Sequence, residues 1–102
     1  MAYEIIWSPE AIRTFDSVIE YLHQKWTTAV IIKFIDDSEN IIHLISKNPY
    51  LFRKSEKENI HQVLVTKQNL LLYQVNEHHK RVELLSFLDA RQNPKKKPTI
   101  KK

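Results

Sequence analysis

Residues Tyr3–Glu10, which read YEIIWSPE, predict a β-strand that runs directly into an α-helix. Tyr3–Trp7 is short, apolar and rich in residues that favour strands. Ser8 is a typical helix N-cap, Pro9 suits the first helical position, and the acid that follows lies in the first turn. The chain is therefore expected to begin with a strand whose last residue fixes the start of a helix.

Two helices are expected after this junction. The first should end near Lys25, and the second should begin at a cap provided by Thr27 or Thr28. Asn48-Pro49 should end it, because the residue before a proline disfavours the helical conformation. The very tight turn between the helices predicts an antiparallel hairpin. Apolar residues at steps of three and four should face the core: Ile12, Phe15, Ile19, Leu22 and Trp26 in the first helix, and Ile31, Phe34, Ile35, Ile41, Ile42 and Ile45 in the second.

Beyond a polar connector over residues 50–59, the pattern changes to three short strands. The runs Ile60–Thr66, Leu70–Asn76 and Arg81–Leu88 are dominated by Val, Leu, Ile, Tyr and Phe. This order predicts an α+β domain over residues 1–94: an N-terminal strand, a two-helix antiparallel hairpin, and a three-stranded meander that completes a mostly antiparallel four-stranded sheet. Residues 95–102 are expected to form a disordered, lysine-rich tail.

The composition excludes several classes of site. The absence of cysteine removes thiol nucleophiles, thiolate metal sites and disulfides. The absence of glycine removes the loops that cradle nucleotide phosphates. His78-His79 is not completed by further ligands at a suitable spacing, so we expect neither a metal nor another cofactor. No apolar run is long enough to span a bilayer and the first residues lack a signal-peptide pattern, so we expect a cytoplasmic protein that does not bind membranes.

The net charge of +4 says little about the folded body. Residues 95–102 contain five lysines and no acid, which leaves residues 1–94 close to neutral. Composition alone therefore does not indicate a basic patch on the domain.

The strands are apolar on both faces of the predicted sheet, although helices cover only one of them. Leu70-Leu71-Leu72 is apolar at consecutive positions, and side chains alternate between faces along a strand. An exposed apolar sheet face usually marks a binding surface. We therefore expect a protein partner, with contacts at Leu70, Leu72, Leu85 and Phe87.

Five segments of the chain carry a resemblance to a known family: Tyr3–Ala11, Tyr21–Trp26, Asn48-Pro49, Leu72–Val75 and Phe87–Pro94. Together they resemble the RelE/ParE toxins of bacterial type II toxin–antitoxin systems, over nearly the whole chain and in the same order of elements. The resemblance implies the fold described above and a growth-inhibiting toxin. It also implies a cognate antitoxin as the partner at the sheet face, and contact with operator DNA only through that antitoxin.

The RelE-like branch of the family cleaves ribosome-bound mRNA without a metal, which requires cations and proton-transfer groups to converge on one phosphate. The positions that commonly hold two second-strand lysines and a third-strand arginine are occupied here by His61, Val63 and Leu70. A nuclease rebuilt from the remaining residues would use His61 as base, Arg91 and Lys67 on the phosphate, and Arg53 as support. We favour the alternative, in which His61 is an exposed strand residue with no catalytic role.

The ParE-like branch inhibits DNA gyrase and does not need these nuclease residues, and the ending Asp89–Pro94 resembles this branch more closely. The resemblance therefore favours a non-enzymatic gyrase inhibitor. The alternatives are a ribosome-dependent mRNA endoribonuclease and a degenerate antitoxin-binding module without toxicity. Two roles for Arg91 stay open: a structural residue that pairs with Asp89 or with a helix end, or the anion-facing residue of the site. Residues expected to contact the target or nucleic acid are Arg53, Lys54, Lys67, Arg81 and Arg91.

Overall fold

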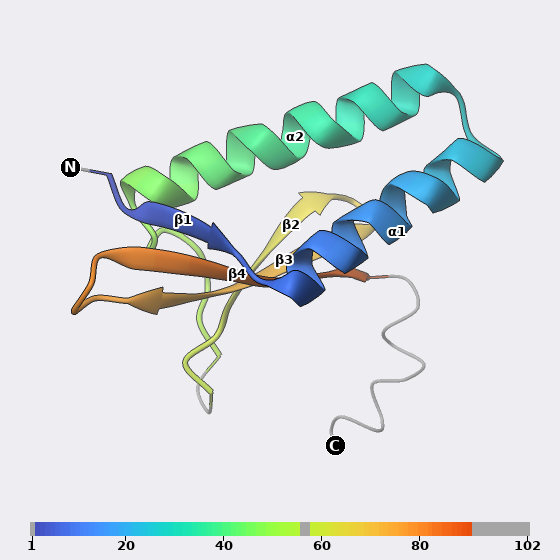
Figure 1. The fold of residues 1–102 in the computed structure, drawn as a ribbon. Helices are drawn as coiled ribbons and strands as arrows, with labels where there is room; N and C mark the ends of the chain where they lie inside the picture. The colour runs from blue at the N-terminus through green and yellow to red at the C-terminus, as the bar shows by residue number, and fades with distance from the viewer. Residues whose placement is uncertain (1, 56–57, 91–102) are drawn as a thin grey trace.

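Two helices lie on one face of a four-stranded sheet in the computed structural model, which describes residues 2–55 and 58–90 (Figure 1). The elements are β1 (Glu4–Trp7), α1 (Pro9–Lys25), α2 (Thr28–Lys47), β2 (His61–Thr66), β3 (Asn69–Asn76) and β4 (Arg81–Asp89). The strand order is β1-β4-β3-β2, with β1 parallel to β4 and the other neighbours antiparallel. The predicted fold class and order of elements are confirmed.

The junction between β1 and α1 forms where the sequence places it. The Ser8 hydroxyl accepts a hydrogen bond from the Ala11 amide at 3.0 Å, which caps the helix, and Pro9 is the first helical residue. The same hydroxyl donates to the Leu85 carbonyl at 3.1 Å, and the Ser8 amide donates to the Leu84 carbonyl at 3.1 Å. One serine therefore starts the helix and attaches it to β4.

The core lies between the helices and the face of the sheet that they cover, here called the inner face. A cluster of aromatic rings occupies its centre, with ring centroids 5.1 Å apart for Phe15 and Phe87 and 5.3 Å apart for Phe15 and Phe34. Tyr73 is fully buried, and its hydroxyl donates to the Pro49 carbonyl at 2.8 Å. This bond joins the end of α2 to the middle of the sheet, so the core phenol keeps a hydrogen-bond partner.

The buried side of α1 differs from the predicted stripe. Leu22 is buried as predicted, and Phe15 and Ile19 pack against the core. Ile12, however, is 51% exposed and Trp26 is 53% exposed, while Ala11 and Thr14, which are outside the predicted stripe, are buried. The hydroxyl of Thr14 accepts a hydrogen bond from the Phe87 amide at 2.8 Å, and this contact rotates the helix so that its threonine side faces β4. Trp26 is the C-cap residue in an extended conformation, so its side chain leaves the helical stripe.

A β-bulge in β4 changes which side chains reach the core. Leu72 pairs with Ser86 and Tyr73 pairs with Leu84, which leaves Leu85 as the extra residue. Phe87 therefore pairs with Leu71 and lies on the inner face. Without the bulge, the alternation of side chains from Leu84 onward would place Phe87 on the other face of the sheet. Phe87 is 3% exposed. The prediction that Phe87 contacts a partner at the surface is therefore wrong, because its side chain is buried in the core.

Neither helix of the described segments is long and apolar enough to cross a membrane. The lysine-rich tail predicted for residues 95–102 lies outside the residues that the structure describes.

Candidate functional site

The face of the sheet away from the helices, here called the outer face, carries a row of leucines. Leu64 pairs with Leu70, and Leu70 pairs with Leu88, so the three side chains lie side by side across β2, β3 and β4. Leu64 is 53% exposed, and the other two are partly buried. Leu72 lies in the next row, between Gln62 and Ser86. Leu70 and Leu72, two of the predicted partner contacts, therefore lie in neighbouring rows of the outer face.

The charged groups on the outer face do not form a cationic cluster. At the β1 side, Glu4 pairs with Arg81 in the sheet and its carboxylate lies 3.2 Å from the Arg81 guanidinium. Glu83 lies beside Gln74 and lines an open hollow of about 320 Å³ with Asn59, Val75, Asn76 and Glu77. A phosphate placed in this hollow would meet two carboxylates and no cationic lining residue.

The predicted basic contacts lie at three separate places. Arg53 and Lys54 belong to the connector that runs beside β2, where the Gln62 amide donates to the Arg53 carbonyl at 3.0 Å. Lys67 lies in the turn between β2 and β3, and Arg81 begins β4 at the other end of the sheet. Arg91 lies outside the described residues. The structure therefore does not bring Lys67 and Arg81 together.

His61 is buried, which corrects the expectation that it is an exposed strand residue. It is 3% exposed, and its ring stacks on Tyr73 with centroids 4.9 Å apart and an interplanar angle of 11°. Its Nδ1 lies 3.0 Å from the Phe52 carbonyl oxygen. Because its partners are the connector and the inner face, His61 does not present a base to the outer face.

A polar cluster that the sequence did not predict joins the N-terminus, the connector and the β3–β4 turn. The Glu77 carboxylate accepts hydrogen bonds from Lys80, from the Tyr50 hydroxyl and from the Tyr3 hydroxyl. These bonds, with Lys80 first, lower the pKa of Glu77 from 4.5 to about 2. The hydrogen bond to Glu77 in turn raises the pKa of Tyr50 to about 12. The Glu77–Lys80 spacing is visible in the sequence, but the contact with Tyr3 spans 74 residues.

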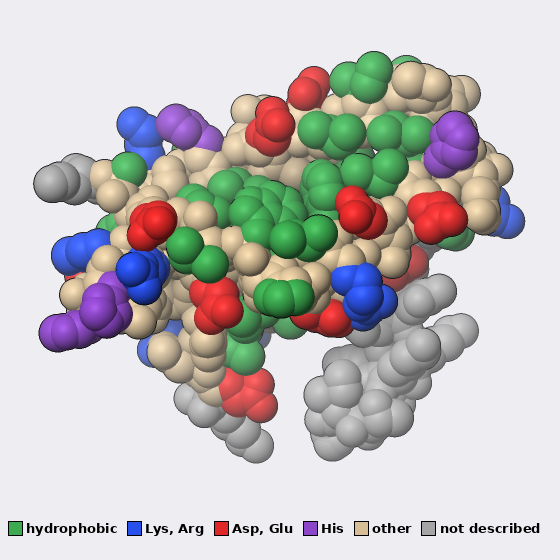
Figure 2. Space-filling view, viewed as in Figure 1, with side chains coloured by type: hydrophobic (Ala, Val, Ile, Leu, Met, Phe, Trp, Pro, Cys, Tyr) green, Lys and Arg blue, Asp and Glu red, His purple; other side chains and the backbone are tan. Residues whose placement is uncertain are grey.

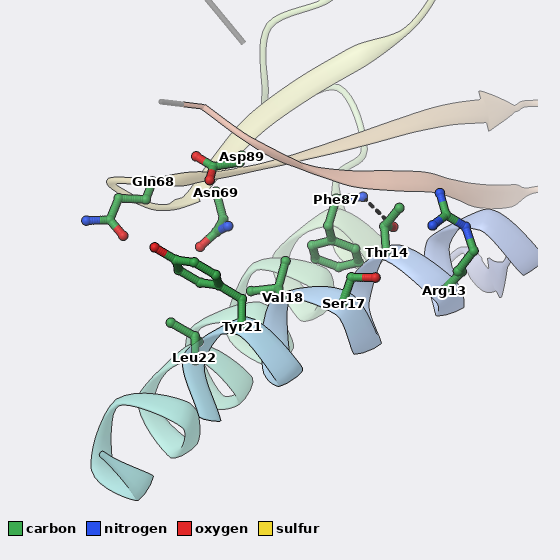
Figure 3. A pocket seen from close by; sticks show the side chains of 10 residues that line it. All are labelled: Arg13, Thr14, Ser17, Val18, Tyr21, Leu22, Gln68, Asn69, Phe87 and Asp89. Carbon is green, nitrogen blue, oxygen red and sulfur yellow. Dashed lines mark hydrogen bonds between the residues drawn. The ribbon is translucent and has the colours of Figure 1, made fainter. Parts of the chain in front are cut away.

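A pocket of about 260 Å³ lies between α1 and the end of β4 (Figure 3). Figure 3 shows the Tyr21 hydroxyl pointing toward the side of the pocket formed by Gln68, Asn69 and Asp89. The floor includes Phe87, whose amide bonds to Thr14. The lining contains neither histidine nor lysine, so it lacks the basic partner that usually activates a hydroxyl nucleophile.

No group of three or more His, Cys, Asp or Glu side chains that could hold a metal ion occurs within residues 2–55 and 58–90.

Comparison with known proteins identifies the family. A model of the ParE toxin of type II toxin–antitoxin systems, parDE, matches residues 5–94. No curated protein sequence matches the chain. Among solved structures, the chromosomal ParDE toxin–antitoxin system of P. aeruginosa matches with a TM-score of 0.72 and 13% identity, over 86% of this chain and 96% of that chain. The isolated E. coli RelE toxin matches with a TM-score of 0.64 and 14% identity, over 98% and 97% of the two chains.

The intact E. coli RelBE toxin–antitoxin complex also matches, with a TM-score of 0.62 and 15% identity, over 87% of this chain and 98% of that chain. At these identities the structural matches establish the fold, and the family model adds the membership. Since that model spans residues 5–94, the chain belongs to the family of ParE toxins of type II toxin–antitoxin systems.

Proposed function

We propose that this toxin arrests growth by binding DNA gyrase, and that its cognate antitoxin neutralises it by covering the outer face of the sheet. The proposal assigns target contact to the exposed cations of the connector and the β2–β3 turn, and antitoxin contact to the leucine row. It assigns no catalytic residue.

The charge of the outer face is the observation that carries the proposal. Metal-free cleavage of RNA needs several cations at one phosphate, and the loss of one such donor typically reduces the rate by about 100-fold or more. Among the described residues of this face, Arg81 is already paired with Glu4, and Glu83 lies nearby. Val63 is buried in the core, and Leu70 belongs to the leucine row. The face therefore favours protein contact over phosphoryl transfer.

The burial of His61 argues in the same direction. A general base must come within hydrogen-bond reach of the hydroxyl that it deprotonates. The ring of His61 lies between Tyr73 and Tyr50, and its Nδ1 lies within hydrogen-bond distance of the Phe52 carbonyl. His61, which a rebuilt nuclease would need as its base, therefore holds the connector against the sheet.

The cations assigned to target contact are exposed and have no ion-pair partner among the described residues. Arg53 and Lys54 lie together in the connector, and Lys67 lies in the β2–β3 turn. Unpaired exposed cations strengthen contact with acidic protein surfaces mainly through the association rate. They are therefore the side chains on which gyrase binding is expected to depend.

The leucine row supports antitoxin contact because apolar side chains left open on a sheet usually mark an interface. The E. coli RelBE structure is a toxin–antitoxin complex. A bound antitoxin segment would remove Leu64 from water and complete the burial of Leu70 and Leu72, and each buried CH₂ group contributes about 0.8 kcal/mol.

Expression of the chain without its neighbouring gene tests the proposal. Growth arrest with broken DNA and a DNA-damage response is the expected result, and co-expression of the neighbouring gene should restore growth. Codon-positioned mRNA cleavage would identify a ribonuclease instead. Normal growth would identify an antitoxin-binding module without toxicity.

A further inference from the structure

A cavity of about 350 Å³, here called the turn cavity, lies between the helices and the β2–β3 turn. It adjoins the pocket of Figure 3, with which it shares Leu22, Gln68 and Asn69 as lining residues. Small-molecule sites in proteins usually have volumes of about 300 to 1,000 Å³. The turn cavity is therefore large enough for a small ligand.

Side chains of the two helices give the turn cavity an apolar wall. The wall consists of Leu22 from α1 and of Val30 and Phe34 from α2. Leu22 and Phe34 are buried, and Val30 is partly buried. Two of the three side chains are aliphatic, and the third, Phe34, already packs its ring against Phe15, with the centroids 5.3 Å apart. An alkyl chain therefore suits this wall better than an aromatic ring.

The side of the turn cavity that faces this wall carries a buried amide group. Asn69 is 9% exposed, and its Oδ1 accepts a hydrogen bond from the Thr66 hydroxyl at 3.0 Å. That hydroxyl accepts a bond from the Gln68 backbone amide at 3.2 Å, so the turn itself orients the Asn69 side chain. Figure 3 shows this side chain directed from the sheet toward the helices. Within the described residues, Nδ2 of Asn69 has no hydrogen-bond partner. Because buried polar groups are nearly always hydrogen-bonded, this donor points to an acceptor on a ligand.

The charges that line the turn cavity leave one cation without a partner. The Lys33 ammonium lies 3.1 Å from the Asp37 carboxylate, so these two charges compensate each other. Lys67 is exposed, and none of the ion pairs between described residues includes it. A ligand with a single negative charge is therefore the best electrostatic complement to the cavity.

The apolar surface on the helix side of the molecule has a different electrostatic character. Figure 2 shows hydrophobic side chains between β1 and the helices, with acidic side chains beside them. Those acids would repel an anion. An anionic ligand with an apolar body is therefore expected to distinguish the turn cavity from this surface.

We propose that the turn cavity binds a medium-chain aliphatic monocarboxylate. The alkyl chain would pack against Leu22, Val30 and Phe34. The carboxylate would accept hydrogen bonds from the Lys67 ammonium and from Nδ2 of Asn69, and such charge-assisted bonds are stronger than neutral ones. Both donors belong to residues at the β2–β3 turn that line the cavity. The inference does not depend on the target of the toxin, because it concerns binding to the chain alone.

Titration of the full chain with octanoate, followed through its amide NMR signals, tests this inference. Octanoate should shift the signals of Val30, Phe34 and Asn69 in a saturable manner, and its affinity should fall as salt is added. Two controls are octylamine, which has a similar chain and the opposite charge, and acetate, which lacks the chain. Each should bind at least about tenfold more weakly. Absence of octanoate binding, equal binding of octylamine, or shifts confined to β1 or to the leucine row would overturn the inference.

Variants locate the binding site. Lys67→Gln should weaken octanoate binding by at least about tenfold, because it removes the cation. Asn69→Asp keeps the acceptor for Thr66 but replaces the amide donor with a negatively charged oxygen, so it should abolish binding. Lys47→Gln removes the same charge from the far end of α2 and is the matched control, which should leave binding unchanged.

Circular dichroism verifies that each variant folds. If Asn69→Asp does not fold, Lys67→Gln decides the question, because Lys67 is exposed in a turn. Unchanged octanoate binding in Lys67→Gln, or an equal loss of binding in Lys47→Gln, would contradict the proposal.

Discussion

The imidazole of His61 stacks on the phenol ring of Tyr73, with the ring centroids 4.9 Å apart. Both side chains are buried on the inner face of the sheet, and both hold the segment after α2: Tyr73 through the Pro49 carbonyl and His61 through the Phe52 carbonyl. This pair fixes the connector that carries Arg53 and Lys54 beside β2. The histidine that most resembles a catalytic base by its sequence position is thus part of the core.

The first prediction concerns this pair. His61→Ala should lower the free energy of unfolding by roughly 2 kcal/mol, because it removes a buried ring and leaves the Phe52 carbonyl without its partner. Growth arrest by the folded fraction should persist. Urea denaturation and a growth assay at matched protein levels measure the two effects. His43→Ala, at an exposed position on α2, is the control and should change stability by less than about 0.5 kcal/mol.

A second prediction concerns the contact between α1 and β4. Thr14→Val keeps the shape of the side chain but removes the acceptor of the Phe87 amide, which is buried. A buried donor without a partner costs between about 1 and 3 kcal/mol, so the urea midpoint should fall accordingly. Ser17→Ala, one turn along the same helix and exposed, should have little effect. Equal stability of Thr14→Val and the unaltered chain would show that this bond does not hold the helix.

The sequence was sufficient to predict the elements because the signals for each one are local. Ser8 and Pro9 start α1, Asn48 and Pro49 end α2, and the residues at the strand ends are typical of turns. Sequence periodicity also placed most of the α2 stripe correctly. The rotation of α1 could not be predicted, because it depends on the hydrogen bond of Thr14 to an amide 73 residues away.

Two features of the candidate site were not predictable for related reasons. The bulge at Leu85 moves Phe87 into the core. A bulge inside a continuous run of apolar residues cannot be recognised from the sequence, because the residues on both sides of it are also apolar. His61 and the cluster around Glu77 depend on the path of the connector, which brings Phe52 and Tyr50 to the sheet. Such contacts arise from the tertiary fold and not from a local pattern.

The Glu77 cluster predicts a specific pH dependence. The pKa of Glu77 is lowered in the folded state from 4.5 to about 2, so its contribution to stability is present above pH 4.5 and is lost as the pH falls through 2. Glu77→Gln should therefore be less stable than the unaltered chain near neutral pH. The difference should shrink as acid is added. Urea midpoints measured across this range test the sign, and a constant difference would contradict it.

If the antitoxin binds the outer face, a substitution there should impair neutralisation by the antitoxin without reducing toxicity. Leu70→Asp should still fold and arrest growth, because Leu70 lies outside the core. Co-expression of the neighbouring gene should no longer restore growth, since a charge would enter the leucine row. Gln24→Asp adds the same charge at an exposed position on α1 and serves as the control. Full rescue of Leu70→Asp by the antitoxin would exclude this part of the sheet from the interface.

The target of the toxin is tested most directly by mapping both DNA breaks and mRNA ends in cells that express the chain without its neighbouring gene. Gyrase binding predicts accumulated DNA breaks and a DNA-damage response, with mRNA ends unchanged, and the same pattern for His61→Ala at matched levels of folded protein. Ribosome-dependent mRNA cleavage that disappears in His61→Ala would contradict the gyrase proposal and assign the chain a ribonuclease activity.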